Sequence, residues 1–224
     1  MSLPVVAVVD TGVDDALALV VAARHPALDL RGVLCTAGNV PLERVLANTH
    51  HVLSLLDVRA PVAVGAARRL NGLRFAGRSV HGPDGLAGLG PQDGPVTSDR
   101  VVLAAAELVT PDVVVVSLGP LTSLVGLPVG RVVASYARPG EANHEMDPPA
   151  ARSVAAEKAD VPDHPVSITP GEGPLGELVA DLLRHQARRA AGLGDAAVML
   201  GLAEPSLGPQ HWTHRVQLLA AGRD

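Results

Sequence analysis

The chain has 224 residues, 47% of them hydrophobic, so its length and composition allow one large buried core. A formal net charge of −5, with Lys158 as the single lysine, excludes a basic surface for phosphate backbones, and an aromatic content of 1% excludes a platform for stacked bases. We therefore expect no nucleic-acid partner.

Apolar, β-branched runs bounded by Gly, Pro or Asp predict six buried strands. These runs are residues 4–9, 30–35, 61–64, 113–117, 131–136 and 166–169. Helical patterns occur at 14–24, 42–56, 99–109, 121–127, 149–159, 175–191 and 195–202. The alternation predicts one α/β domain over residues 1–224, with a mainly parallel central sheet flanked by helices and ligands at the carboxyl ends of the strands.

Other features of the sequence predict two long loops, a buried cysteine and a cytoplasmic location. Residues 68–97 are rich in Gly and Pro, and residues 137–148 lack a sustained period. The single cysteine, Cys35, lies in an apolar run and is expected to be buried and inert. The first residues lack a signal-peptide pattern, and every apolar run is shorter than a bilayer span, so we expect a cytoplasmic protein without a membrane contact.

An acidic loop, 10–15, follows the first predicted strand and leads into a helix. It places Asp10, Asp14 and Asp15 close together, and Gly12 allows a tight turn. Asp14 or Asp15 could simply cap the helix, but one cap explains one carboxylate. Three carboxylates repel each other without a cation, and oxygen ligands suit calcium or magnesium, so the loop predicts a divalent metal site.

Several other kinds of site fit this chain poorly. An aspartate pair for phosphoryl transfer would need a second acidic residue where Gly12 stands. The run Gly88-Leu89-Gly90 lies in a predicted loop rather than between a strand and a helix, so it is not a dinucleotide fingerprint. His144-Glu145 lacks the second histidine of a zinc protease helix.

Short motifs spread along most of the chain share their order with one enzyme family. They are Asp10-Thr11-Gly12-Val13-Asp14-Asp15, Thr36-Ala37-Gly38-Asn39, His81-Gly82-Pro83-Asp84-Gly85-Leu86, Leu118-Gly119-Pro120, Glu141-Ala142-Asn143 and Asp195-Ala196-Ala197-Val198. Together they resemble the inosine-uridine-preferring nucleoside hydrolase family. The resemblance implies calcium-dependent cleavage of the N-glycosidic bond between ribose and a nucleobase, in a homo-oligomer that acts on a small nucleoside or riboside.

The resemblance also implies a role for individual residues. Calcium would be held by side chains from both ends of the chain and by one carbonyl, namely Asp10, Asp15, Asp195 and the carbonyl of Leu118. Asp10 would also be the general base for the attacking water. The substrate-binding residues would be Asp14 at the ribose hydroxyls, Glu141 and Asn143 at the remaining sugar hydroxyls, and Asn39 beside the metal and water.

The chain departs from the family pattern at several positions. Val8 and Thr11 stand where the family usually has Asp and Pro. Gly194 stands where many members have a histidine that protonates the leaving base, and residues 137–140 replace a longer segment with ribose contacts. His81 begins a loop in which the family often has a base-contacting histidine, so we expect a catalytic role for it, with a purely structural role in the turn as the alternative.

The other candidate donors carry less signal. His185 is expected to be a solvated residue on a helix, and Trp212, between His211 and His214, is expected in the core or at an oligomer contact. Two alternatives to nucleoside hydrolysis stay open. One is a non-catalytic relative that keeps the metal and binds a sugar, and the other is a specialised enzyme acting on another glycoside.

Overall fold

The computed structural model describes residues 1–77, 79–91, 102–159, 167–189, 193–204 and 215–217. Seven of the described strands form one sheet in the order β4-β3-β2-β1-β5-β6-β7, and each neighbouring pair is parallel. Their bounds are β1 Leu3–Val9, β2 Leu28–Cys35, β3 Val62–Val64, β4 Val102–Leu103, β5 Val114–Ser117, β6 Arg131–Ala134 and β7 Glu157–Lys158. The predicted α/β class with a parallel central sheet is confirmed. That residues 1–224 form one domain stays a prediction.

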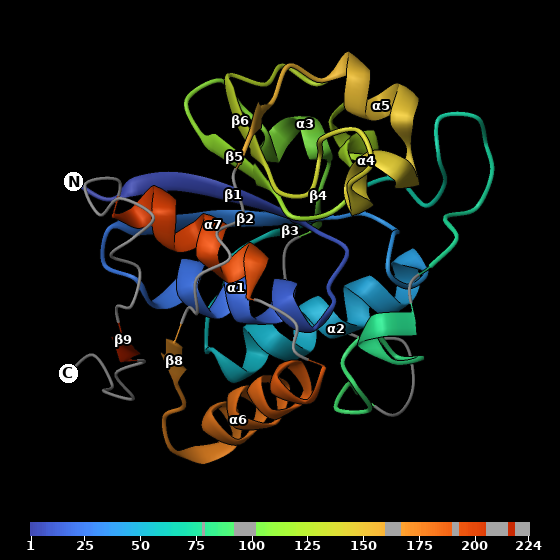
Figure 1. Cartoon of the computed structure of the whole chain (residues 1–224). Helices are drawn as coiled ribbons and strands as arrows, with labels where there is room; N and C mark the ends of the chain where they lie inside the picture. The colour runs from blue at the N-terminus through green and yellow to red at the C-terminus, as the bar shows by residue number, and fades with distance from the viewer. Residues whose placement is uncertain (78, 92–101, 160–166, 190–192, 205–214, 218–224) are drawn as a thin grey trace.

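Helices cover both faces of this sheet (Figure 1). On one face lie α1 (Val13–Arg24), α2 (Leu42–Leu55) and α7 (Gly194–Ala203), with α6 (Gly173–Arg188) packed outside them. The opposite face carries α3 (Ala105–Leu108), α4 (Ala142–Met146) and α5 (Pro148–Ser153). Two short 3-10 turns, η1 (Ser79–His81) and η2 (Leu121–Leu124), complete the described helical elements.

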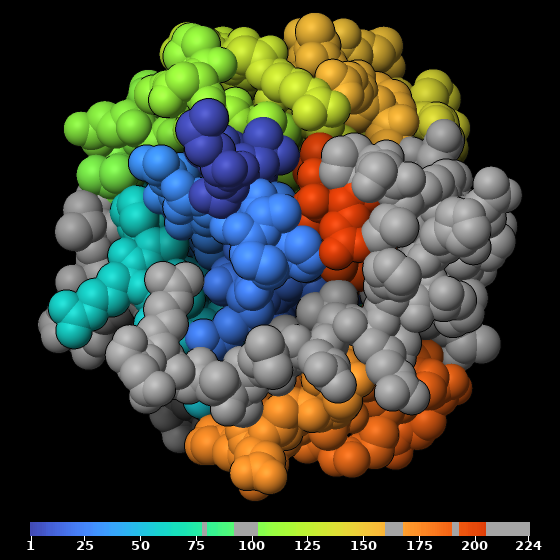
Figure 2. All heavy atoms as spheres, turned by 90° about the vertical axis from the view of Figure 1, so that its left-hand side faces the viewer, coloured from blue at the N-terminus to red at the C-terminus, as the bar shows by residue number. Residues whose placement is uncertain are grey.

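The apolar pattern of β1 explains why the sheet is covered twice. Val5, Ala7 and Val9 join one hydrophobic cluster, whereas Val6 and Val8 join the other. All five are fully buried, as expected for a central strand whose alternate side chains point to opposite faces. Seen from the side on which β1 begins, Figure 2 shows the green and yellow β5–α5 half at the top, the blue N-terminal segments in the middle and the orange α6 at the bottom.

The strand order places a crevice beside β1. The chain builds outward from β1 to β4 and then returns to the other side of β1 with β5. The connections that follow β1 and β5 therefore leave in opposite directions, which opens a space at the carboxyl ends of these two strands. Asp10 follows β1 and Leu118 follows β5, so both residues lie at this position.

Several predicted elements differ from the structure. The predicted helix 99–109 is wrong, because β4 pairs with β3 there and α3 is only one turn long, while 99–101 lie outside the described residues. The predicted helix 149–159 ends at Ser153, since the chain then adds β7 beside β6. Residues 121–127 contain only the turn η2, and β8 (Ser167–Thr169) pairs with β9 (Arg215–Gln217) in a separate sheet.

None of the helices in the described part of the chain combines the length and the apolar character that a bilayer crossing requires.

Cys35 should not react in the folded protein. Its thiol is fully buried and donates a hydrogen bond to Thr49 Oγ1 at 3.3 Å, and burial raises the pKa of the thiol to about 12. We expect no alkylation by iodoacetamide at about pH 8 in native protein, and complete alkylation of the one thiol in denaturant. Mass spectrometry measures both, and rapid labelling of native protein at a rate close to that of the unfolded chain would contradict the burial.

Candidate functional site

A cavity of about 400 Å³ lies at the carboxyl ends of β1 and β5. Residues from seven separate segments of the chain line it. Among its lining residues are Asp10, Asp14, Asn39, His81, Leu118, Glu141, Asn143 and Asp195. Of the site residues predicted from the sequence, Asp15 alone is not part of the lining; it is buried and accepts the backbone N–H of Asp10.

Asp10 is held by the loop that follows β2. Its Oδ2 accepts a hydrogen bond from the backbone N–H of Asn39 at 2.7 Å. Two glycines provide the room for its carboxylate: a Cβ on Gly38 would lie 2.1 Å from Asp10 Oδ2, and a Cβ on Gly119 would lie 2.9 Å from Asp10 Oδ1. The glycines of two separate motifs therefore serve one side chain.

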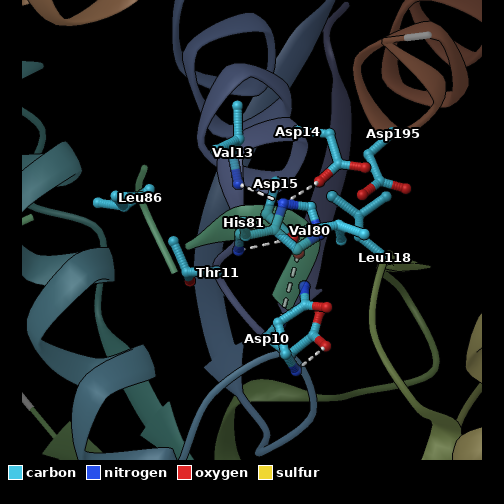
Figure 3. Close-up of polar contacts among 12 residues, drawn as sticks. Asp10, Thr11, Val13, Asp14, Asp15, Val80, His81, Leu86, Leu118 and Asp195 are labelled. Atoms are coloured by element: carbon cyan, nitrogen blue, oxygen red, sulfur yellow. Dashed lines mark hydrogen bonds and ion pairs between the residues drawn. The ribbon is translucent and has the colours of Figure 1, made fainter. Parts of the chain in front are cut away.

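Three carboxyl groups meet between α1 and α7. Asp14, Asp15 and Asp195 each offer an oxygen, and these oxygens lie within 4.8 Å of one another. Figure 3 shows the carboxylates of Asp14 and Asp195 pointing toward each other from the two helices. Asp10 is outside this group, so the structure brings Asp14, rather than Asp10, to the two other predicted metal-binding side chains.

Hydrogen bonds orient the two buried members of this acidic cluster. Asp15 Oδ1 accepts the N–H of Asp10 at 3.3 Å, and its Oδ2 accepts the N–H of Gly12 at 2.9 Å. Asp15 therefore also stabilises the first turn of α1, which is the helix-capping role considered for this loop. Asp195 Oδ1 accepts a hydrogen bond from the hydroxyl of Ser135 at 2.7 Å.

The electrostatics of the cluster fit a cation. Burial raises the pKa of Asp15 well above its ordinary value, and the neighbouring Asp10 and Asp14 raise it further. Burial also raises the pKa of Asp195, with added repulsion from Asp14 and Asp15. Asp14 Oδ1 is buried and accepts no hydrogen bond from any described residue. A divalent ion would compensate these charges and occupy oxygen ligands of the kind it prefers.

His81 lies over the start of α1. The turn η1 carries it, and its Nδ1 accepts the backbone N–H of Val13 at 3.2 Å and lies 3.7 Å from Asp14 Oδ1 (Figure 3). Because Nδ1 is an acceptor, the neutral ring carries its proton on Nε2. A Cβ on Gly12 would lie 2.9 Å from the ring, so the absence of a side chain there allows His81 to pack against the loop.

Two of the predicted sugar-binding residues, Glu141 and Asn143, line the cavity at the start of α4. Glu141 directly precedes α4, and its Oε2 accepts the N–H of Arg138 at 2.6 Å. The side-chain amide of Asn143 donates to the carbonyl of Leu118 at 2.6 Å and to that of Ser135 at 3.1 Å. Asn143 thus fixes the Leu118 carbonyl that we expected to bind calcium.

Sequence reasoning missed three residues of this site. Ser135 follows β6 and contacts Asp195, while Gln186 and Arg189 reach the cavity from the end of α6. Ser135 directly follows a parallel strand, and this position could have identified it as a site residue. No sequence pattern indicated that Gln186 and Arg189 would reach the cavity. The expectation for His185 is wrong, because this residue is half-buried and its Nε2 lies 3.1 Å from the carbonyl oxygen of Val80. His211, Trp212 and His214 lie outside the described residues.

A second, larger cavity of about 680 Å³ lies on the far side of Asn39. It is formed by the loop 37–43 and by residues of the 67–83 region, including Arg68, Arg74 and Phe75. The acidic cluster and His81 do not line it. The chemical groups are concentrated in the smaller cavity, which we take as the candidate active site.

The chain is similar to nucleoside hydrolases in sequence and in fold. Residues 5–127 match the model of the family described as inosine-uridine preferring nucleoside hydrolase. Pyrimidine-specific ribonucleoside hydrolase RihB from Escherichia coli strain SE11 is 27% identical over 212 residues, which cover 78% of this chain and 67% of RihB. RihB from Escherichia coli O17:K52:H18 is 32% identical over 122 residues, covering 51% of this chain and 38% of that protein.

Solved structures show the same fold. An inosine-guanosine nucleoside hydrolase superposes with a TM-score of 0.73 at 22% identity, covering 91% of this chain and 79% of that one. A plant nucleoside hydrolase gives a TM-score of 0.69 at 22% identity, covering 92% and 80% of the two chains. The layered α/β architecture is therefore shared with these enzymes.

The acidic cluster predicts that stability falls with pH in metal-free protein. Raised pKa values of Asp15 and Asp195 mean that the folded state binds more protons than the unfolded state above the ordinary value of 3.8. The stability is complete below that value and is lost as the pH rises through the raised values. We expect Tm in chelator to fall as the pH rises above about 4, with a smaller fall in Asp195→Asn.

A divalent cation should oppose this loss. At a hundredfold excess over its Kd it adds about 2.7 kcal/mol of stability, so the gain in Tm should be larger at pH 8 than at pH 5, where protons compete. Thermal melts with calcium and with chelator measure the gain. Equal Tm values with calcium and with chelator at both pH values would contradict a metal site here.

Proposed function

The chain belongs to the inosine-uridine preferring nucleoside hydrolase family, and we propose that it hydrolyses the N-glycosidic bond of a ribonucleoside or related N-riboside with the help of a calcium ion. One observation carries this proposal. Asp10, His81 and two members of the acidic cluster, Asp14 and Asp195, line one cavity at the carboxyl ends of β1 and β5. That arrangement supports a site in which a base, a cation and a hydrogen-bond donor act on one small ligand.

The metal assignment rests on the family resemblance and on the carboxylates that meet between α1 and α7. The family resemblance assigns calcium to Asp10, Asp15, Asp195 and the carbonyl of Leu118. The oxygens of Asp14, Asp15 and Asp195 lie within 4.8 Å of one another, so we add Asp14 to this donor set. A bound divalent cation supplies Lewis acidity and compensates the charge of the cluster. The oxygen-only donors agree with a hard cation such as calcium.

Asp10 is proposed as the general base. Its Oδ2 is fixed by the N–H of Asn39, and the residue lines the cavity, so its carboxylate can accept a proton from the attacking water. The bond to the base breaks as positive charge develops on the sugar ring. The surrounding carboxylates favour that charge, because they are oriented before the reaction and partly shielded from water.

The sugar would lie between Asp14 and the wall formed by Glu141 and Asn143. All three residues line the cavity and can bind hydroxyl groups, which orients the ring for attack from the side of Asp10. His81 would donate from Nε2 to the departing base. Assembly of copies of this chain into a homo-oligomer stays a prediction from the family resemblance.

A second function is favoured by a specific feature of this chain. Gly194, directly before Asp195, offers no side chain to protonate a base, and the 137–140 segment is shorter than in the family pattern. A relative that binds metal and sugar without turnover, or one that acts on a glycoside with a better leaving group, would share both features.

Replacement of the general base should abolish turnover but keep the fold. In Asp10→Asn the amide oxygen can still accept the N–H of Asn39 but cannot take a proton from water, so we expect kcat to fall by about 10²–10⁴-fold. Asp195→Ala should instead raise the calcium concentration needed for half-maximal activity. Steady-state kinetics with a calcium titration measure both, and wild-type turnover by Asp10→Asn would remove the base assignment.

The leaving group separates the proposed function from its alternatives. Because Gly194 provides no acid, we expect slow hydrolysis of inosine and uridine and faster hydrolysis of p-nitrophenyl riboside, whose phenolate departs without a proton. His81→Ala should slow only the nucleosides. Wild-type activity on the phenolic riboside alone would indicate the specialised enzyme. No activity on either substrate, despite calcium binding, would indicate the non-catalytic relative.

A further inference from the structure

Two hydrogen bonds hold His81 in the turn η1. The carbonyl of His81 accepts the N–H of Ala87 at 2.8 Å, and its ring accepts the N–H of Val13. Both contacts restrain His81 itself. Placement of the ring also depends on the preceding peptide, because rotation of the backbone at Val80 would swing the side chain away from Val13.

A residue of α6 holds that preceding peptide. His185 Nε2 lies 3.1 Å from the carbonyl oxygen of Val80, although the two residues are 105 positions apart. A carbonyl only accepts, so His185 donates from Nε2. Both the charged ring and the neutral ring with its proton on Nε2 can form this bond. Gln186, the next residue, is buried and lines the same cavity as Val80 and His81.

We infer that His185 is a positioning residue for leaving-group departure. Through the carbonyl of Val80 it holds the turn η1 so that the ring of His81 stays over Val13 and at the cavity wall. It lies outside the cavity lining and acts only through this turn. The inference rests on the proposed function, because His81 assists only where a base departs.

The hydrogen bond from His185 to Val80 should affect departure of the base rather than binding of the sugar. The proposed sugar contacts come from Asp14, Glu141 and Asn143, whereas the hydrogen bond of His185 is to Val80, directly before His81. A displacement of about 1 Å at a catalytic group costs up to about 10²-fold in rate. Loss of the contact should therefore lower kcat for substrates that need His81 and leave KM almost unchanged.

The test compares His185→Gln and His185→Asn, two variants with amide side chains, in the full chain with saturating calcium. The amide of His185→Gln reaches about as far as the histidine Nε2, whereas His185→Asn is shorter and cannot reach Val80. We expect kcat for inosine or uridine to fall about 10-fold to 100-fold in His185→Asn and to return to near wild type in His185→Gln. Hydrolysis of p-nitrophenyl riboside should be unchanged in both variants.

Arg184→Ala is the matched control, since Arg184 is an exposed neighbour on the same helix that pairs with Asp181. It should keep wild-type kinetics on both substrates. Equal nucleoside activity of the Asn and Gln variants, or a parallel loss on both substrates, would overturn the inference. A wild-type chain active on the phenolic riboside alone would also overturn it, because His81 would then assist no departing base.

Failure of the proposed function is distinguishable from failure of this inference. A wild-type chain inactive on both substrates removes the hydrolysis, and the ring nitrogen NMR signals of His81 then test the positioning without turnover. A change of these signals in His185→Asn that His185→Gln reverses supports the contact. Identical signals in all three proteins overturn it.

Discussion

Asp14, Asp15 and Asp195 bring carboxylate oxygens within 4.8 Å of one another between α1 and α7, where burial limits the screening of their repulsion. The packing of α7 against α1 builds the core on this face and also places Asp195 beside the acidic loop. Protons or a cation must therefore compensate the charge for the two helices to pack. Stability and the proposed chemistry depend on the same compensation.

The site is shaped as much by missing side chains as by the groups that line it. Gly38 and Gly119 leave the space that Asp10 occupies, and Gly12 leaves the space for His81 and Asn39. Any larger residue at these three positions would meet a neighbouring atom closer than 3.0 Å from its Cβ. The glycines of the motifs thus determine how near the base, the cation site and the histidine lie to one another.

The sequence predicted the parts of the fold that depend on local pattern. The buried runs of β1 and β5 and the helical pattern of α1 and α6 were recognised, and with them the acidic loop at the end of a central strand. Short elements were missed, because β4 and β7 are defined by pairing with the neighbouring strands rather than by their two residues. The contacts of Ser135 with Asp195 and of His185 with Val80 join residues 60 and 105 positions apart, and no local pattern reports such pairs.

The route of the chain through the sheet also has a consequence for synthesis on the ribosome. The acidic loop is made among the first residues, whereas α7 emerges near the other end, and α1 lacks a large part of its packing until then. Domains generally fold as units. The acidic loop therefore stays hydrated on the growing chain until α7 has been made, and the three carboxylates meet only when α7 packs against α1. Their repulsion is absent from every shorter nascent chain.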